Sequence, residues 1–202
     1  MNENIKNYWE NAHKNNLKEP LSGYGLYGVW TALNITDKLI PNIKTLIIGV
    51  GLGNETVELS KHKDVIIDVL DISENAINKV KSITRSQYLS SNISDLPIDE
   101  YDVVTCHLVN QHMNDEDFNE QVKYVLRSLN PDGVFALQFA FVENVDEVPQ
   151  GEESQKGGGV IRKLSEIEKF VKNNSGQISW VSDVVKFPHT PARWQYVHIK
   201  RK

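Results

Sequence analysis

The stretch that decides the fold is Thr45-Leu46-Ile47-Ile48-Gly49-Val50-Gly51-Leu52-Gly53-Asn54-Glu55, in which an apolar run ends in three glycines at alternating positions. A strand that turns sharply into a helix presents backbone N–H groups to a ligand at the turn. Glycine permits the positive φ values of such a turn and the close approach of a ligand. Asp71 ends the next apolar run, where an ionised carboxylate can accept hydrogen bonds from a ribose diol. The stretch therefore indicates a nucleoside-binding α/β fold.

The spacing of the glycines separates two classes of nucleoside-binding protein. Dinucleotide-binding folds use G-x-G-x-x-G, whereas Gly49, Gly51 and Gly53 follow the pattern G-x-G-x-G. Glu55 lies in the first turn of the expected helix, where a carboxylate disfavours a pyrophosphate. A ligand that carries an ammonium group fits this charge better. A nicotinamide-dependent oxidoreductase would need its third glycine at Asn54, so the sequence argues against that class.

At these glycines the chain resembles the class I S-adenosylmethionine-dependent methyltransferases, whose loop has the form G-x-G-x-G. Four further segments resemble the family in its order: the second strand (Val65–Ser73), the adenine loop (Ser91–Pro97), the fourth strand (Asp102–His107) and the turn into the fifth strand (Leu126–Gly133). The resemblance is close over residues 40–145. It implies that the cofactor is S-adenosyl-L-methionine.

The resemblance also assigns roles to residues and reveals two departures from the family. It implies three groups of cofactor contacts: the amino-acid end at Gly49, Val50, Gly51 and Gly53, the ribose at Asp71 and Ile72, and the adenine at Asn92 and Ile93. The family usually has an acidic residue at the position of Ile47, which often helps to hold the amino-acid end, so that contact must come from elsewhere. Asn92 stands where the family commonly has aspartate, but its side-chain carbonyl can still accept a hydrogen bond.

Aromatic residues near the N-terminus resemble the segment that covers the cofactor in small-molecule methyltransferases. They are Tyr8 and Trp9, with His13 nearby, followed by Tyr24 and Tyr27. Aromatic faces attract a sulfonium as they attract an ammonium group. Tyr8 could also donate a hydrogen bond to the cofactor carboxylate, which would offset the loss at position 47. The alternative is that these rings pack against the sheet.

The order of predicted elements gives the fold class. We expect strands near 44–49, 65–70, 86–90, 101–106 and 133–141, helices near 54–61, 73–83, 115–129 and 164–173, and two earlier helices within 1–19 and 26–40. This alternation predicts a parallel sheet with helices on both faces. Two β-rich runs, 177–187 and 193–200, are joined by a short link and must be antiparallel.

The predicted fold is therefore α/β: a Rossmann-like class I methyltransferase fold with a seven-stranded, mostly parallel sheet and a C-terminal antiparallel hairpin strand. We expect a single methyltransferase domain over residues 1–202, with a helical cap over the cofactor at 1–40 and the core at 41–202. The hairpin at the sheet edge could support a homodimer.

The composition argues against several classes of protein. A net charge of −5 disfavours nucleic acid as a partner, because phosphate binding needs a clustered basic surface. The sequence has no apolar run of about 18 residues to span a membrane, and residues 1–6 lack the apolar core of a signal peptide. The single cysteine is typical of a reducing compartment. We expect a cytoplasmic protein without membrane or nucleic-acid partners.

Three residues are candidates for the base in methyl transfer. His107 follows the fourth predicted strand directly and is the preferred base, although such a histidine can also serve only as a wall of the cofactor pocket. His112 is the second choice, because many family members have a histidine pair where Gln111 and His112 stand. Glu143, just past the fifth predicted strand, is the third. His13 is interpreted as structural or exposed.

No metal site is expected. The histidines lack the paired spacing of metal ligands, and the cysteine stands alone. Asp115, Glu116 and Asp117 are adjacent, but acidic residues in this position fit the first turn of a helix better.

The sequence thus predicts a methyltransferase that acts on the hydroxyl of a small molecule, such as a sugar or another metabolite. Two alternatives remain open: methylation of a small amine, and a non-catalytic S-adenosylmethionine-binding protein of the same fold. The glycine-rich segment 147–159 is either a surface loop or a substrate lid, since loops of this length inside compact domains are often functional.

Overall fold

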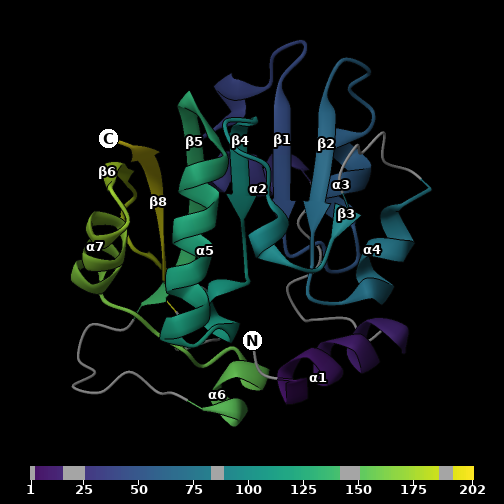
Figure 1. The fold of residues 1–202 in the computed structure, drawn as a ribbon, viewed down its shortest axis with the longest axis vertical. Helices are drawn as coiled ribbons and strands as arrows, with labels where there is room; N and C mark the ends of the chain where they lie inside the picture. The colour runs from purple at the N-terminus through teal and green to yellow at the C-terminus, as the bar shows by residue number, and fades with distance from the viewer. Residues whose placement is uncertain (1–2, 16–25, 83–88, 142–150, 187–192) are drawn as a thin grey trace.

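Strands and helices alternate along most of the chain in the computed structural model, which describes residues 3–15, 26–82, 89–141, 151–186 and 193–202 (Figure 1). The strands are β1 (Lys44–Ile48), β2 (Ile66–Leu70), β3 (Leu89–Ser90), β4 (Tyr101–Cys106), β5 (Leu129–Phe141), β6 (Gly176–Val181), β7 (Val185–Lys186) and β8 (Arg193–Arg201). The α-helices are α1 (Glu3–Lys14), α2 (Leu26–Ala32), α3 (Asn54–Leu59), α4 (Glu74–Val80), α5 (Asp115–Ser128), α6 (Glu152–Gly157) and α7 (Leu164–Asn173). Three 3-10 turns are η1 (Thr36–Lys38), η2 (Ile93–Asp95) and η3 (Asn110–His112).

The strands form one mixed sheet in the order β3-β2-β1-β4-β5-β8-β6, and β7 pairs with β8. The pairs among β1 to β5 are parallel, whereas β8 runs antiparallel to β5, β6 and β7. The short link before β8 cannot reverse the chain any other way. This order, with its reversed strand near one edge, confirms the predicted fold class.

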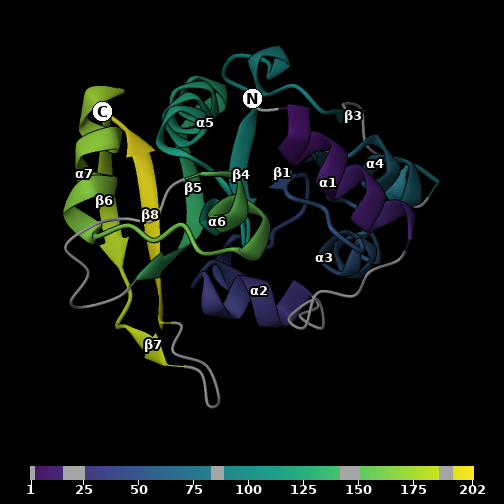
Figure 2. The same cartoon turned by 90° about the horizontal axis from the view of Figure 1, so that it is seen from below.

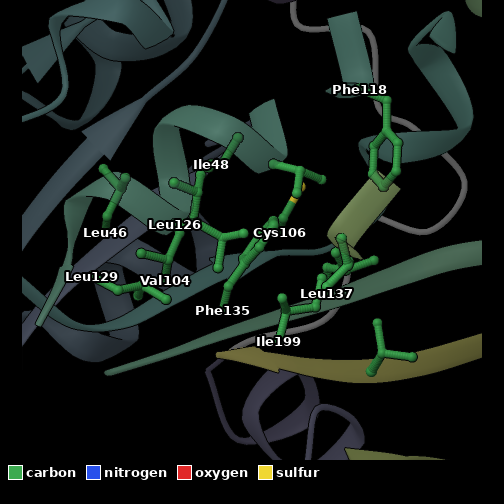
Figure 3. Packing of buried hydrophobic residues seen from close by; sticks show 14 of the residues in the cluster. Leu46, Ile48, Val104, Cys106, Phe118, Leu126, Leu129, Phe135, Leu137 and Ile199 are labelled. Atoms are coloured by element: carbon green, nitrogen blue, oxygen red, sulfur yellow. The ribbon is translucent and has the colours of Figure 1, made fainter. Parts of the chain in front are cut away.

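The central strands are buried on both faces, which their continuous apolar sequences predict. In β1, Leu46 and Ile48 join the core formed with α5 and α7, whereas Ile47 joins the core on the opposite face. Figure 3 shows the first of these cores, in which Phe118 and Leu126 of α5 lie against side chains of the strands. Side chains alternate between the two faces of a strand, so a strand buried on both faces is apolar at most positions.

Helices cover the two faces unequally. Helices α5 and α7 pack on one face, and α2, α3 and α4 supply apolar residues to the core on the other. Figure 2 shows α5 and α2 on opposite sides of the strands. Helices α1 and α6 instead lie across the carboxyl ends of the central strands, below the arrowheads in Figure 1. No helix in the described ranges is long and apolar enough to cross a bilayer.

The structure corrects several predicted boundaries. The helix expected over 26–40 ends at Ala32, because Asn34 has a φ of +53°, a conformation that a helix cannot contain. Strand β5 begins four residues earlier than expected, since Leu129 already pairs with Tyr101 of β4. The predicted loop at 147–159 contains α6 within its described part, 151–159. Residues 16–19 and 86–88 lie outside the described residues.

Helix α1 is fixed to the core by the carboxylate of Glu10, which lies at the N-terminus of α4. It accepts hydrogen bonds from the Ser73 hydroxyl (2.8 Å), from the Glu74 and Asn75 amides (2.7 and 3.1 Å) and from the Asn75 side chain (2.8 Å). The first amides of a helix lack partners within the helix and favour negative charge. Ser73 itself caps α4, as its Oγ accepts a hydrogen bond from the Ala76 amide.

We predict that Glu10→Ala weakens the docking of α1 on α4. The free energy of unfolding should fall by about 1 kcal/mol, the usual value of a helix cap, and amides of α1 should exchange with deuterium faster. Asn11→Ala changes an exposed residue of the same helix and serves as the control. Equal exchange rates in the two variants would contradict the assigned role of Glu10.

Candidate functional site

A cavity of about 530 Å³ lies at the carboxyl ends of the central strands, where residues of α1 also line it. Open α/β sheets bind ligands at this edge. Ten of the residues predicted from the sequence line the cavity: Trp9, Gly49, Val50, Gly51, Asp71, Ile72, Asn92, Ile93, His107 and His112. They come from segments as far apart as α1 and η3, and the parallel order of the strands brings them together.

The glycine loop has the backbone that its sequence predicts, but its third glycine has a different role. Gly49 and Gly51 line the cavity with φ values of +81° and +54°. A Cβ atom on Gly51 would meet no protein atom within 4 Å, because this position faces open space. Gly53 does not line the cavity in the described structure; it precedes α3 with a φ of +84°, and a Cβ there would lie 2.6 Å from Val80 of α4. Gly53 therefore permits two helices to pack closely.

Asp71 connects the glycine loop to the end of β2. Its Oδ2 accepts a hydrogen bond from the Gly51 amide (3.3 Å), and its Oδ1 accepts one from the Ser73 amide (2.8 Å). Burial raises the pKa of Asp71, whereas these hydrogen bonds and the charge of His13 act in the opposite direction. An ionised carboxylate has about four acceptor positions, so Asp71 can bind a ribose diol while it holds the loop.

The predicted adenine contacts line the cavity just after β3. The Asn92 Oδ1 accepts a hydrogen bond from the Ser94 amide (3.3 Å), and its Nδ2 donates one to Asp95 (3.2 Å). Asn92 thus caps η2 and places Ile93 at the cavity wall. An amide oxygen has two lone pairs, so the Asn92 carbonyl retains one for an exocyclic amine.

His107 is held among aromatic rings at the end of β4. Its ring lies parallel to Tyr196, with 6.2 Å between centroids, and edge-on to Trp194 at the same separation. Burial lowers the pKa of His107 to about 4, so the ring is neutral at pH 7. A base this weak accepts a proton poorly at neutral pH, because general-base catalysis is most effective when the pKa lies near the working pH.

His112 has a defined tautomer. Its Nδ1 lies 2.6 Å from the carbonyl oxygen of Gln155 in α6, and a carbonyl only accepts, so Nδ1 carries the proton and Nε2 the lone pair. The ring packs edge-on against Trp9, with 4.7 Å between centroids. Burial lowers the pKa of His112, and the bond to Gln155 partly opposes this effect. The neutral ring therefore presents an unprotonated nitrogen.

Arg162 fixes the turn that carries His112. Its guanidinium donates to the carbonyl oxygens of Asn110 (3.0 Å) and Met113 (2.8 Å), on either side of His112, and to the Asp115 carboxylate (2.9 and 3.1 Å). The side chain is buried, so it is part of the framework rather than a contact for an anionic acceptor. Asp115 lies in the first turn of α5, as its sequence predicts.

Two of the predicted residues that the structure describes, Tyr8 and Gly53, do not line the cavity. Tyr8 is 38% exposed and does not line the cavity in the described structure. It lies one position from Trp9 on α1, and neighbouring helix residues point about 100° apart. The hydrogen bond from Tyr8 to the cofactor carboxylate stays a prediction. Gly53 has the packing role described above. Glu143 lies outside the described residues.

Sequence reasoning gave too little weight to His13 and Glu55, which both line the cavity. His13 is 7% exposed rather than on the surface, and burial lowers its pKa while the charge of Asp71 raises it. The signal was present in the spacing, because Trp9 and His13 are four residues apart and share one face of α1. The sequence showed that Glu55 places a negative charge in the first turn of α3, but it could not show that the side chain points into the cavity.

The cavity lining is acidic. It includes five carboxylates, Glu3, Glu55, Asp71, Asp117 and Glu120, and one lysine, Lys6. Such a surface attracts cations and repels anions. S-adenosylmethionine carries a sulfonium and an ammonium group against one carboxylate, so these residues fit it, whereas a dinucleotide pyrophosphate does not suit them. In the described ranges, no group of three or more histidine, cysteine or acidic side chains could hold a metal ion.

Comparisons with known proteins agree with this geometry. Residues 46–133 match the family model described as a methyltransferase domain. A Burkholderia thailandensis 1,6-didemethyltoxoflavin N1-methyltransferase superposes with a TM-score of 0.73 at 12% identity, over 98% of this chain and 87% of that one. Magnesium protoporphyrin IX methyltransferase from Synechocystis PCC 6803 gives 0.70 at 15% identity, over 98% and 95%.

A third solved structure, the mitomycin 7-O-methyltransferase, gives a TM-score of 0.58 at 15% identity. The match covers 80% of this chain and 49% of the mitomycin enzyme, so this chain spans about half the length of that relative. A search of curated proteins found no match. Residues 46–133 therefore match a methyltransferase domain, and the strand order and the solved structures show that the chain has the class I methyltransferase fold.

The lowered pKa of the half-buried His107 predicts how stability depends on pH. Its folded pKa of about 4 lies below the unfolded value of about 6.5, so the unfolded chain binds more protons between these pH values. Stability should therefore fall as pH drops from 6.5 towards 4. Urea unfolding should show a smaller loss over this range in His107→Gln than in wild type. The same loss in both proteins would contradict a lowered pKa at His107. His62→Gln, beyond the end of α3, is the control.

Proposed function

We propose that the protein transfers a methyl group to a hydroxyl of a small molecule, with His112 as the base. The bound cofactor supplies an electrophilic methyl group on its sulfonium. The observation that supports the proposal is the fixed tautomer of His112, whose Nδ1–H donates to the Gln155 carbonyl and whose ring lines the same cavity as Asp71 and the glycine loop. This arrangement leaves Nε2 ready to accept a hydroxyl proton.

The proposal ranks His112 above His107 as the base, whereas the sequence favoured His107. A pKa of about 4 makes His107 a weak base, and its contacts with Tyr196 and Trp194 suit a wall that excludes water. His112 is held from two sides, by Gln155 of α6 and by the carbonyls that Arg162 fixes around η3. Positioning of this kind supplies much of the rate enhancement in an in-line displacement.

The covering helices favour a small acceptor. Residues of α1 line the cavity, and α6 packs against α1 and η3. The Asn4 side chain donates a hydrogen bond to Glu152 (3.0 Å), and the Val160 amide donates one to the Gln111 carbonyl (3.0 Å). Residues 151–160 therefore lie next to His112, the candidate base. The structural neighbours named for mitomycin, protoporphyrin and toxoflavin methylation also take small molecules.

Methylation of a small amine is the second candidate, and the acidic lining favours it. Five carboxylates around the cavity would attract an amine in its cationic form. A neutral amine needs little help from a base at the moment of transfer, so this reaction would depend less on His112. The toxoflavin enzyme among the structural neighbours is named as an N-methyltransferase.

We predict that calorimetric titration with S-adenosylhomocysteine shows binding that Asp71→Asn weakens at least about tenfold, the effect of removing a charged hydrogen-bond partner. NADH should not bind, because the cavity lining is acidic. Wild-type protein that is folded yet binds NADH and not S-adenosylhomocysteine would contradict the assignment of the cofactor.

We also predict that loss of the candidate base His112 slows methyl transfer to a hydroxyl. With a labelled methyl donor and a panel of small alcohols and amines, His112→Gln should lower kcat on a hydroxyl acceptor by about 100- to 10,000-fold. S-adenosylhomocysteine should bind this variant as it binds wild type. Activity on an amine that survives the substitution would favour N-methylation, and a protein that binds the cofactor but methylates nothing in the panel would favour the non-catalytic alternative.

A further inference from the structure

The carboxylate of Glu55 is partly buried beside the glycine loop, without a cationic partner among the described residues. Its Oε1 accepts hydrogen bonds from Trp30 Nε1 of α2 (2.9 Å) and from Thr105 Oγ1 of β4 (3.0 Å), both of them neutral donors. Burial raises the pKa of Glu55 to about 7, although the two hydrogen bonds oppose this effect. A buried acid without a counter-ion is costly to ionise, so its presence in a ligand cavity calls for an explanation.

The carboxylate of Glu55 lies near the place where this chain lacks the acid that the related methyltransferases usually have. Position 47, where the related methyltransferases usually have an acid, is Ile47 in this chain. In the pairing of β1 with β4, Ile47 lies directly opposite Thr105, the residue that holds the Glu55 carboxylate. Ile47 and Trp30 belong to the same buried cluster. The carboxylate of Glu55 therefore reaches, from α3, the place beside β1 where an acid is missing.

We propose that Glu55 replaces the missing acid and binds the ammonium group at the amino-acid end of the cofactor. The inference rests on the cofactor assignment and on the orientation that puts the ribose at Asp71 and the adenine at Asn92. That orientation directs the amino-acid end towards Gly49 and Gly51, at the end of β1. Glu55 lines this part of the cavity wall, and it follows the glycine loop in the first turn of α3.

The neighbouring titratable groups leave the cofactor as the natural partner of this carboxylate. Burial raises the pKa of the adjacent Cys106 thiol to about 12, and His107, next on β4, is neutral at pH 7. Asp71 and His13, which also line the cavity, interact with each other: the charge of His13 lowers the pKa of Asp71, and the charge of Asp71 raises the pKa of His13. An ammonium group would offset the cost of ionising Glu55, so binding near pH 6.5 should release a proton.

Two ligands and two variants test this inference. S-adenosylhomocysteine has the amino-acid end, whereas 5′-methylthioadenosine has the same adenosine and thioether without it. Glu55→Gln keeps an oxygen acceptor for Trp30 and Thr105 but removes the charge. It should weaken S-adenosylhomocysteine binding by about 10- to 100-fold, the range for a hydrogen bond to a charged group, and leave the affinity for 5′-methylthioadenosine unchanged. Glu58→Gln, one turn further along α3, is the matched control and should bind both ligands as wild type does.

Asp71→Asn separates failure of this inference from failure of the cofactor assignment, because it should weaken both ligands. If Glu55→Gln binds S-adenosylhomocysteine like wild type, or weakens both ligands equally, the ammonium contact is refuted while the cofactor assignment stands. If wild type binds neither ligand, both fall. Titration at pH 6.5 in two buffers of different ionisation enthalpy should show proton release in wild type that is absent in Glu55→Gln, and equal release in both would also refute the inference.

Discussion

The hydrogen bonds of the Asp71 carboxylate determine the geometry of the whole site. Through the amides of Gly51 and Ser73, Asp71 joins the loop after β1 to the segment between β2 and α4. Ser73 in turn caps α4 and donates to Glu10 of α1. The glycine loop, the N-terminus of α4 and the covering helix are thus positioned around one buried carboxylate, which also faces the cavity.

The cavity lining carries more acidic than basic side chains, so a cationic ligand would balance its charge. Glu55 is held by two neutral donors, and His107 is kept neutral by burial. Both features have a cost in the protein alone, because loss of solvent disfavours the charged form of each group. They make sense together in a cavity that receives a cationic ligand, where ionised carboxylates are needed and a protonated histidine would be repulsive. A neutral His112 nearby is suited to the same environment.

The sequence was sufficient to predict the fold and the gathering of residues from the strand ends around one cavity, since these depend on local signals. Gly49, Gly51 and Asp71 lie at strand ends, and parallel strands bring their ends together whatever the details of packing. The remaining features depend on tertiary contacts. Nothing local distinguishes Gly53, which lies close to Val80 of α4, from Gly49 and Gly51, which line the cavity. The bond between His112 and Gln155 joins residues 43 positions apart, and α6 lies in a segment whose glycines predicted only a loop.

The most direct test of this account is a crystal structure of the protein with S-adenosylhomocysteine. We predict that the ribose hydroxyls lie within hydrogen-bonding distance of Asp71, with the adenine at Asn92 and Ile93 and the amino group beside Glu55. The thioether should then point towards the side of the cavity that carries His107 and His112. A ligand bound in the opposite direction, or away from Asp71, would contradict the assigned orientation and with it the roles of both histidines.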